Sequence, residues 1–177
     1  MSTPFTAHET AIAGMWQLAA KSATDDRGTV REFFRTSAFV EAGVPTAERW
    51  AQINITWTRA GALRGLHGEA MTKLVGVASG AALGAYVDAR QASATFGKVV
   101  TVHLEPGVQV LVPAGVCNGF QALADGCQYL YCFDAEWRPG MPGVAVRPTD
   151  PALGIDWPLP ITVMSDKDAA APLFAEL

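Results

Sequence analysis

GALRGLHGEAMTK (residues 61–73) is the most informative segment of this chain. A glycine opens it, and side chains that can carry charge then recur among small and apolar residues. A second segment, GVQVLVPAGVCN (residues 107–118), places an apolar run between glycines and a proline. The whole chain has 17 glycines and 11 prolines, and because both residues mark turns between short elements, this content disfavours a helix-rich architecture.

Short apolar runs at regular intervals surround these two segments. From residue 52 onward such runs, each bounded by Gly, Pro, Asp or Asn, predict strands at residues 52–57, 73–79, 82–89, 98–104, 108–112, 119–123 and 127–133. Upstream, we expect strands at residues 11–18 and 30–34, a turn at 25–28 and one or two helical turns at 36–42. Many short strands with turn signals are typical of a β-sandwich or barrel. The sequence therefore predicts an all-β fold.

The C-terminal quarter differs from the rest of the chain. Residues 134–177 hold seven of the 11 prolines, which predicts an irregular arm that wraps the barrel and ends in a short helix around residues 166–171. Half of the 177 residues are apolar and 17% are charged, which is ample for a packed core. We find no internal repeat or linker and expect one domain over residues 1–177.

Charge and composition exclude several classes of protein. Thirteen Lys and Arg against 17 Asp and Glu give a net charge of −4, so there is no basic surplus for a nucleic-acid backbone. The first residues lack the pattern of a secretion signal, and no uncharged stretch suits a membrane span. Three cysteines at unremarkable spacing suit a reducing compartment. We therefore expect a cytoplasmic protein that binds neither nucleic acid nor membrane.

The two opening segments match the spacing of the two cupin motifs, G-x5-H-x-H-x3-E-x6-G and G-x5-P-x-G-x2-H. A metal-binding cupin fills its four ligand positions with three histidines and a carboxylate, but here they hold His67, Glu69, Lys73 and Asn118. An ammonium has no lone pair for a cation, and asparagine is a poor ligand for a transition metal. We therefore expect no metal and no other cofactor. An imidazole beside a fixed ammonium suits removal of a proton next to a carbonyl, with the charge stabilising the enolate.

In addition, the chain resembles the dTDP-4-dehydrorhamnose 3,5-epimerase (RmlC-type) family. The matching motifs, in chain order, are Asp26-Arg27-Gly28 with Glu32, Gln52-x-Asn54, Arg64-Gly65-Leu66-His67, Lys73-Leu74-Val75, Val87-Asp88-x-Arg90, Ser93-x-Thr95-Phe96-Gly97-Lys98, Pro113-x-Gly115-x-x-Asn118-Gly119-Phe120, Tyr131, Asp150-Pro151, Ile155-x-Trp157-Pro158 and Ser165-x-Lys167-Asp168. Together they extend over about 140 residues. The resemblance implies a cupin jelly roll with short peripheral helices, a metal-free homodimer, and action on nucleotide-linked 4-keto sugars.

The resemblance also implies roles for single residues. His67 would remove the proton beside the C4 ketone, and Asp168 would orient and stabilise its imidazole. Lys73 would stabilise the enolate oxygen, and Tyr131 would protonate the opposite face of the ring. The residues that would hold the nucleotide, diphosphate and sugar are Arg64, Arg27, Glu32, Gln52, Asn54, Asn118 and Trp137.

Departures from the family pattern keep alternatives open. Asn118 replaces a histidine, Val30 an aromatic residue that stacks on the base, Trp137 a tyrosine and Glu69 a glutamine. The favoured function is a dTDP-4-keto-6-deoxyglucose 3,5-epimerase. The alternatives are an epimerase of C3 or C5 alone on a GDP- or CDP-linked sugar such as a heptose, and a catalytically silent nucleotide-sugar-binding cupin.

Four further residues and one further class of protein are considered beside this interpretation. His8 and His103 receive no role, and Arg90 with Lys98 is expected to be a solvated turn pair. A metal-dependent cupin, such as a dioxygenase, would need a cation where Lys73 stands.

Overall fold

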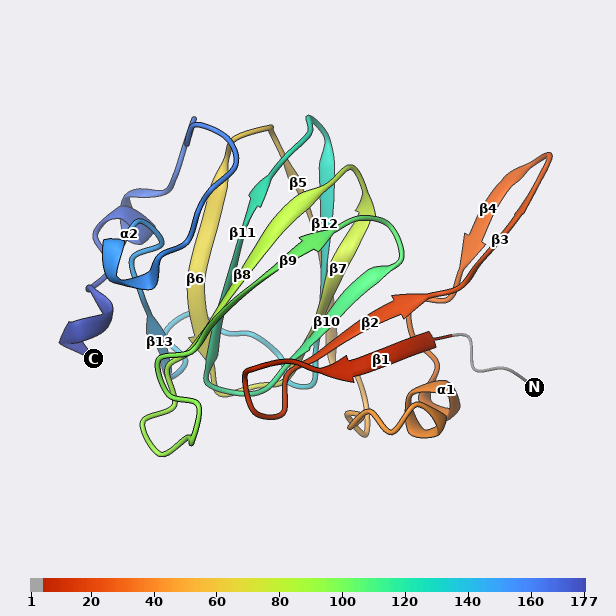
Figure 1. Cartoon of the computed structure of the whole chain (residues 1–177), viewed down its shortest axis with the longest axis horizontal. Coiled ribbons are helices and arrows are strands. Elements are labelled where there is room, and N and C mark those ends of the chain that lie inside the picture. Colours follow the sequence, from red (N-terminus) through yellow and green to blue (C-terminus); the bar gives the residue numbers. More distant parts are fainter. Residues whose placement is uncertain (1–4) are drawn as a thin grey trace.

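The computed structural model describes residues 5–177 and shows two antiparallel sheets packed face to face (Figure 1). The larger sheet has the strand order β1-β2-β10-β7-β12-β5, and the smaller has the order β13-β6-β11-β8-β9. The strands are β1 (Phe5–Glu9), β2 (Trp16–Ala20), β3 (Ser22–Asp25), β4 (Gly28–Arg31), β5 (Gln52–Thr58), β6 (Leu63–Glu69), β7 (Lys73–Ser79), β8 (Ala82–Asp88), β9 (Val99–Leu104), β10 (Val108–Val112), β11 (Val116–Ala122), β12 (Cys127–Phe133) and β13 (Gly143–Ala145). This is the predicted cupin-type jelly roll.

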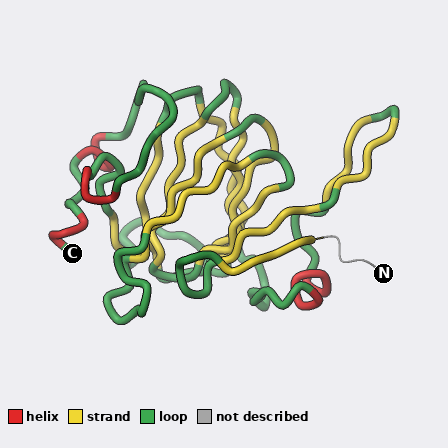
Figure 2. Tube along the Cα trace, in the orientation of Figure 1, coloured by secondary structure: helices red, strands yellow, loops and turns green. Residues whose placement is uncertain are grey.

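The helical elements are short and peripheral. They are α1 (Thr36–Glu41), α2 (Asp166–Ala169) and the 3₁₀ turns η1 (Pro151–Leu153) and η2 (Phe174–Glu176). Figure 2 shows α1 near the N-terminal end and the others at the opposite end of the molecule, with the sheets between them. Within residues 5–177, no helix is long and apolar enough to cross a bilayer.

The core lies between the two sheets. Strands of both sheets turn alternate side chains inward, and these include the fully buried Tyr86, Phe120, Tyr129, Val75 and Val110. The rings of Phe120 and Tyr129 stack with centroids 4.0 Å apart, one from each sheet. This apolar layer fixes the distance between the sheets and therefore the width of the space at their open end.

The fold brings the two opening segments of sequence together. β6 and β7 follow one another in the chain but belong to different sheets, so His67 and Glu69 lie in one sheet and Lys73 in the other. β11 pairs with β6 so that Asn118 is opposite His67. Gly65 and Gly119 approach so closely at this point that a Cβ on Gly65 would lie 2.5 Å from the Gly119 Cα. Only glycine fits there, and the pairing register shifts at the same place.

Several sequence-based boundaries need correction. The strand expected at residues 11–18 is confirmed only from Trp16, where β2 begins. The residues before it form the turn that joins β1 to β2, in which Gly14 adopts a positive φ and the Met15 N–H donates to the Ile12 carbonyl. The strand expected at 30–34 ends at Arg31. A strand at β6 was not predicted, since its glycines obscured the pattern. The expectation of no secretion signal falls partly on residues 1–4, which lie outside the described residues.

The structure also corrects the expectation for Arg90. Arg90 is not a solvated turn residue, because its Nε and Nη2 donate to the two carboxylate oxygens of Asp88, each at 2.8 Å. Asp88 is fully buried and also accepts hydrogen bonds from the hydroxyls of Ser93 and Thr95, each at 2.6 Å. Burial by itself would raise the pKa of Asp88, but these four bonds and a fifth from the Arg90 backbone N–H hold it well below its usual range. A buried carboxylate needs such partners.

Candidate active site

Two adjoining cavities, with volumes of about 520 Å³ and about 480 Å³, are lined by residues from both sheets. They share four lining residues, Arg64, His67, Tyr131 and Lys167. The other polar or aromatic residues of the larger cavity include Asn54, Glu69, Lys73, Asn118, Phe133, Trp137 and Arg138. The smaller cavity adds Thr56, Ser165 and Asp168. Together the cavities form a space with ionisable groups at its centre.

His67 and Asp168 form a hydrogen-bonded pair at this centre, although 101 residues separate them in the chain. The His67 Nε2 lies 2.7 Å from Asp168 Oδ1. Asp168 belongs to α2, where the Ser165 hydroxyl accepts from its backbone N–H, and its other carboxylate oxygen accepts from the Gly65 N–H at 3.3 Å. The Asp168 side chain is 6% exposed, whereas that of His67 is 36% exposed. A carboxylate only accepts, so Nε2 carries the proton and Nδ1 is the free basic nitrogen.

Lys73 occupies the floor of the larger cavity, and its side chain is 3% exposed. Its Nζ donates to Asn118 Oδ1 at 2.6 Å and to the His67 carbonyl at 3.0 Å, and it forms an ion pair with Glu69. An ammonium has three donors, and each of these three acceptors can take one. Burial lowers the pKa of Lys73, and the Glu69 carboxylate opposes that shift. Burial would raise the pKa of Glu69, but the ammonium outweighs it and the pKa is lowered.

Tyr131 faces the cavities from β12, in the sheet opposite His67. Its ring lies in a row with Tyr129 and Phe133, at centroid distances of 4.8 and 5.7 Å. Burial raises the pKa of Tyr131, and the nearby carboxylates of Glu69 and Asp168 add to the shift while Arg64 opposes it. The phenol is therefore protonated at neutral pH and can act as an acid.

Asn54, Arg64 and Trp137 line the larger cavity, and Gln52 and Thr58, which do not line it, bond to them. The Gln52 side-chain amide donates to Asn54 Oδ1 at 3.0 Å, and Gln52 Oε1 accepts from the backbone N–H of Trp137 at 2.8 Å. Trp137 is 43% exposed and lines the cavity. Arg64 is exposed and donates through Nε to the Thr58 hydroxyl at 3.2 Å. These five residues leave an aromatic face and a guanidinium available to a ligand.

Arg27 and Glu32 do not reach this site within the chain. Arg27 lies in the turn of the β3–β4 hairpin, which projects from the body of the molecule (Figure 1), and its guanidinium pairs with Asp25 at 2.6 Å. Glu32 pairs with Arg35 at 2.9 Å. Neither residue lines a cavity. Among the described residues β3 and β4 pair only with each other, so a binding role for Arg27 and Glu32 stays a prediction.

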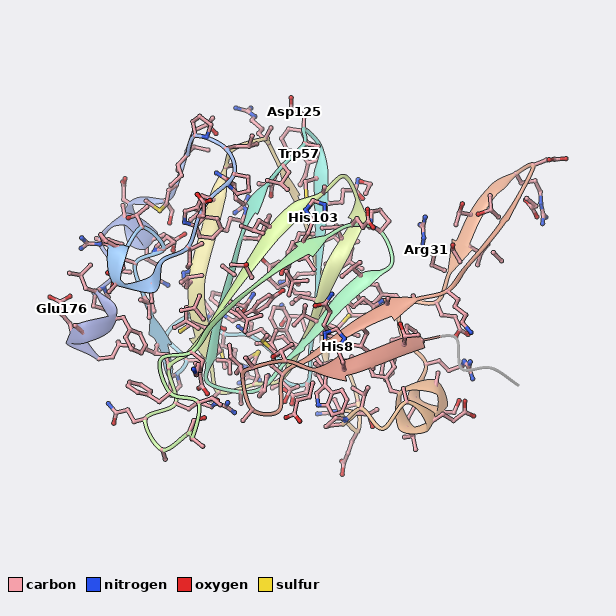
Figure 3. The ribbon with its side chains drawn as sticks, in the orientation of Figure 1. His8, Arg31, Trp57, His103, Asp125 and Glu176 are labelled. Carbon is pink, nitrogen blue, oxygen red and sulfur yellow. The ribbon has the colours of Figure 1, made fainter. Side chains whose placement is uncertain are left out.

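Two cationic residues were missed from the sequence. Lys167 lines both cavities and Arg138 lines the larger one. The available signals were the position of Lys167 next to Asp168 and that of Arg138 next to Trp137. His8 and His103, which received no role, lie on β1 and β9 (Figure 3), and neither lines a cavity.

The four cupin ligand positions are close together, but their chemistry does not fit a metal ion. Lys73 places an ammonium among Glu69, Asn118 and the His67 carbonyl. Within residues 5–177, no three His, Cys, Asp or Glu side chains are grouped so that they could hold a metal. The positive charge in this site is that of a lysine.

Comparison with known proteins agrees with this geometry. The family described as dTDP-4-dehydrorhamnose 3,5-epimerase matches residues 9–176. The Mycobacterium tuberculosis dTDP-4-dehydrorhamnose 3,5-epimerase is 34% identical, over 97% of this chain and 88% of that protein. A Streptomyces bikiniensis dTDP-4-dehydro-6-deoxyglucose 3-epimerase is also 34% identical, over 95% of this chain and 88% of that protein.

A solved structure is similar along almost the whole chain. RmlC from Streptococcus suis, in complex with dTDP-D-xylose, superposes with a TM-score of 0.89 at 31% identity and covers 97% of this chain and 92% of that one. The family match, the two relatives and this fold all extend over the residues that form the site. The chain belongs to the dTDP-4-dehydrorhamnose 3,5-epimerase family, a family of isomerases.

Proposed function

We propose that this protein epimerises a dTDP-linked 4-keto-6-deoxy sugar by removing and returning a proton at carbon 3, carbon 5 or both. The observation that carries the proposal is the placement of His67, bonded to Asp168, and Tyr131 on opposite sheets around the same two cavities. Inversion next to a ketone requires a base on one face of the ring and an acid on the other. The site supplies both.

In the first step, His67 Nδ1 takes the proton from the carbon beside the C4 ketone. The C–H electron pair forms a carbon–carbon double bond, and the ketone oxygen becomes an enolate oxygen. Asp168 stabilises the imidazolium through Nε2 and keeps Nδ1 directed away from itself. The charge of Lys73 stabilises the enolate from the cavity floor. The three N–H donors of Lys73 are already engaged by Asn118, the His67 carbonyl and Glu69. We therefore expect the positive charge of Lys73 to stabilise the enolate through the intervening Asn118 side chain rather than by a direct hydrogen bond.

In the second step, the Tyr131 phenol gives its proton to the opposite face of the same carbon. A new C–H bond forms from the enolate electrons, the ketone is restored, and the configuration is inverted. Tyr131 then regains a proton from solvent and His67 releases its own, so no net proton or electron is consumed. No redox step is required.

Binding of the nucleotide is proposed to use the mouth of the cavities. The guanidinium of Arg64 and the ammonium of Lys167 line both cavities and can neutralise a diphosphate. Trp137 offers an aromatic face for a base, next to the polar pair Gln52 and Asn54. The Streptococcus suis relative binds a dTDP-sugar, which supports the same class of ligand here.

A homodimer would explain the position of the β3–β4 hairpin. Val30 on β4 is 74% exposed, and Ile53, Ile55 and Trp57 on the edge strand β5 are 57–61% exposed. Apolar side chains along an edge strand favour burial against another chain. We propose that a second copy covers this surface and that Arg27 and Glu32 then contribute to the site of the partner.

Mixing two inactive variants tests this assembly. If Arg27 acts in the partner's site, co-refolded His67→Ala and Arg27→Ala chains form some sites with both native residues and regain part of the activity. Failure to regain activity, or a monomer in sedimentation, would remove the dimer proposal.

The three cysteines are free and buried, which agrees with the expected reducing, cytoplasmic location.

The function itself is tested by NMR of dTDP-4-keto-6-deoxyglucose incubated with the enzyme in D2O. Deuterium at carbon 3, carbon 5 or both, with inversion, reports which carbons are deprotonated. Relatives of both kinds exist, since one is named a 3,5-epimerase and another a 3-epimerase. GDP- and CDP-linked 4-keto sugars complete the panel. Binding without exchange of any of them would contradict the proposal and favour a silent binding protein.

A further inference from the structure

Glu69 has a place in the site that the proposed mechanism does not use. His67 and Glu69 are two residues apart on β6, so their side chains project from the same face of the sheet, and both line the larger cavity. Glu69 is 17% exposed and forms an ion pair with Lys73, which crosses from the opposite sheet. The family pattern that this chain resembles has a glutamine at this position, where this chain has a carboxylate.

The environment of Lys73 explains what a carboxylate changes. A buried ammonium without a counter-ion loses much of its hydration and tends to release its proton. The Asn118 amide oxygen and the His67 carbonyl accept hydrogen bonds from Lys73 but carry no net charge. Lysine has donors only, so the same bond fixes the Asn118 amide with its oxygen toward Lys73. The orientation of Asn118 thus depends on a protonated Lys73.

The other titratable groups around Lys73 do not replace Glu69. On β11, burial raises the pKa of the Cys117 thiol to about 12, so it is neutral. On β12, the Tyr131 phenol is neutral because burial also raises its pKa. Asp134, just after β12, accepts from the backbone N–H of the residue before Lys73 rather than from its ammonium. On β6, His67 offers Lys73 its carbonyl, and its ring is bonded to Asp168.

We propose that Glu69 is a positioning residue for the reaction: its carboxylate holds the Lys73 ammonium in its charged form on the cavity floor and thereby fixes Asn118. The consequence for catalysis rests on the proposed function, but the state of Lys73 does not. In this arrangement Glu69 partly neutralises the positive charge that Lys73 presents to the enolate. The distance between the carboxylate and the ammonium therefore sets how strongly Lys73 stabilises the enolate.

NMR of the free enzyme tests the state of Lys73 without any substrate. The chain has four lysines, Lys21, Lys73, Lys98 and Lys167, so a lysine-labelled sample gives four side-chain signals, and a Lys73→Met variant assigns the one of interest. In the native protein we expect Lys73 to stay protonated at neutral pH. In Glu69→Gln, its titration midpoint should fall by at least about one pH unit, as expected for loss of an adjacent opposite charge.

Matched variants keep this test decisive. Glu105→Gln makes the same chemical change at an exposed position outside the cavities and should leave the Lys73 titration unchanged. Glu69→Asp retains the charge and should restore most of the native midpoint. A neutral Lys73 in the native protein at neutral pH would overturn the proposal, as would an unchanged midpoint in Glu69→Gln. The native titration decides the matter alone if Glu69→Gln does not fold.

The activity measurement then separates this proposal from the proposed function. In Glu69→Gln, kcat/KM for deuterium exchange should begin to fall at a lower pH on the alkaline side of the pH profile than it does in the native enzyme, so the loss is largest at alkaline pH. A uniform loss at every pH would indicate a merely structural role and overturn the proposal. If no 4-keto sugar exchanges deuterium while the lysine titration moves as expected, the proposed function fails and the assignment of Glu69 as the counter-ion of Lys73 stands.

Discussion

The ion pairs Lys73–Glu69 and Asp88–Arg90 are both built around a buried charge, but they differ in what surrounds them. Asp88 accepts five hydrogen bonds from Arg90, Ser93 and Thr95, and none of these four residues lines either cavity. Lys73 and Glu69 lie beneath an open cavity, next to His67. The cluster around Asp88 faces neither cavity, whereas Lys73 and Glu69 face the larger one.

The cluster around Asp88 joins distant parts of the chain. Arg90 Nη2 donates to the Ala13 carbonyl at 2.9 Å, and the Thr95 hydroxyl accepts from the Ala13 N–H at 3.0 Å. It thus attaches the β1–β2 turn to the β8–β9 loop. Both clusters lie in segments that match family motifs, so a motif match by itself does not distinguish a stabilising cluster from a catalytic one. We propose that Asp88 contributes to stability and that the residues around His67 carry out the chemistry, and the experiments below test this division.

The largest effect is expected for His67→Ala. Loss of the base should reduce epimerisation and deuterium exchange by about 10³-fold, within the range for a general base. Thermal unfolding should change little, because the His67 side chain is 36% exposed and its removal leaves no buried cavity of comparable size. Rates in D2O and a melting curve measure both quantities. Residual activity within tenfold of the native enzyme would place the base elsewhere.

Asp88→Ala should show the reverse pattern. Removing the carboxylate leaves the donors of Arg90, Ser93 and Thr95 without their shared acceptor, which we expect to cost about 3 kcal/mol of unfolding free energy. At a temperature where the variant is folded, kcat should stay within a few fold of native. Urea unfolding and exchange rates test this. A large loss of kcat in a fully folded Asp88→Ala protein would contradict the division between the two clusters.

Tyr131→Phe sharpens the assignment of roles inside the site. The ring keeps its stacking with Phe133, at 5.7 Å between centroids, and loses only the hydroxyl. Inversion should fall by about 10²-fold. His67 still removes the proton and can return deuterium to the same face, so exchange without inversion should persist. NMR of the recovered sugar separates the two processes, and an equal loss of both would show that Tyr131 has another function.

The sequence predicted the architecture well where apolar alternation is regular. The predicted runs at residues 73–79, 108–112 and 127–133 coincide with β7, β10 and β12. It failed where glycine interrupts the pattern. β6 is rich in glycine and was not recognised, and Gly14 turned the first part of an apparent strand into a connection. Local patterns carry little information at such positions because the pairing partner decides the conformation.

The central residues of the candidate site were predictable from the sequence, but the hydrogen bonds between them were not. His67, Lys73, Tyr131 and Asn118 come together as the motifs implied. The three acceptors of Lys73 could not be foreseen, because they depend on how β6, β7 and β11 pack. Arg27 shows the opposite case, since its motif fits the family while its hairpin lies apart from the site of its own chain.

The smallest expected effect is on stability at acid pH, where protonation of the single carboxylate of Asp88 weakens the cluster around it. The pKa of Asp88 is lower in the folded state than the ordinary value near 3.8, so its contribution to stability is present above that value and is lost as the pH falls below it. Native protein should therefore lose unfolding free energy between about pH 4 and pH 2. Asp88→Asn carries no titrating group at this position, so its stability should start lower and decline less steeply over the same range. Asp156→Asn is the matched control, because Asp156 is exposed, lies in a loop and lines neither cavity. Its unfolding free energy should decline with falling pH as that of the native protein does. If the plots of unfolding free energy against pH are parallel for the native protein and Asp88→Asn, the surrounding donors do not stabilise the charged form of Asp88. That result would contradict the contrast drawn between the two clusters.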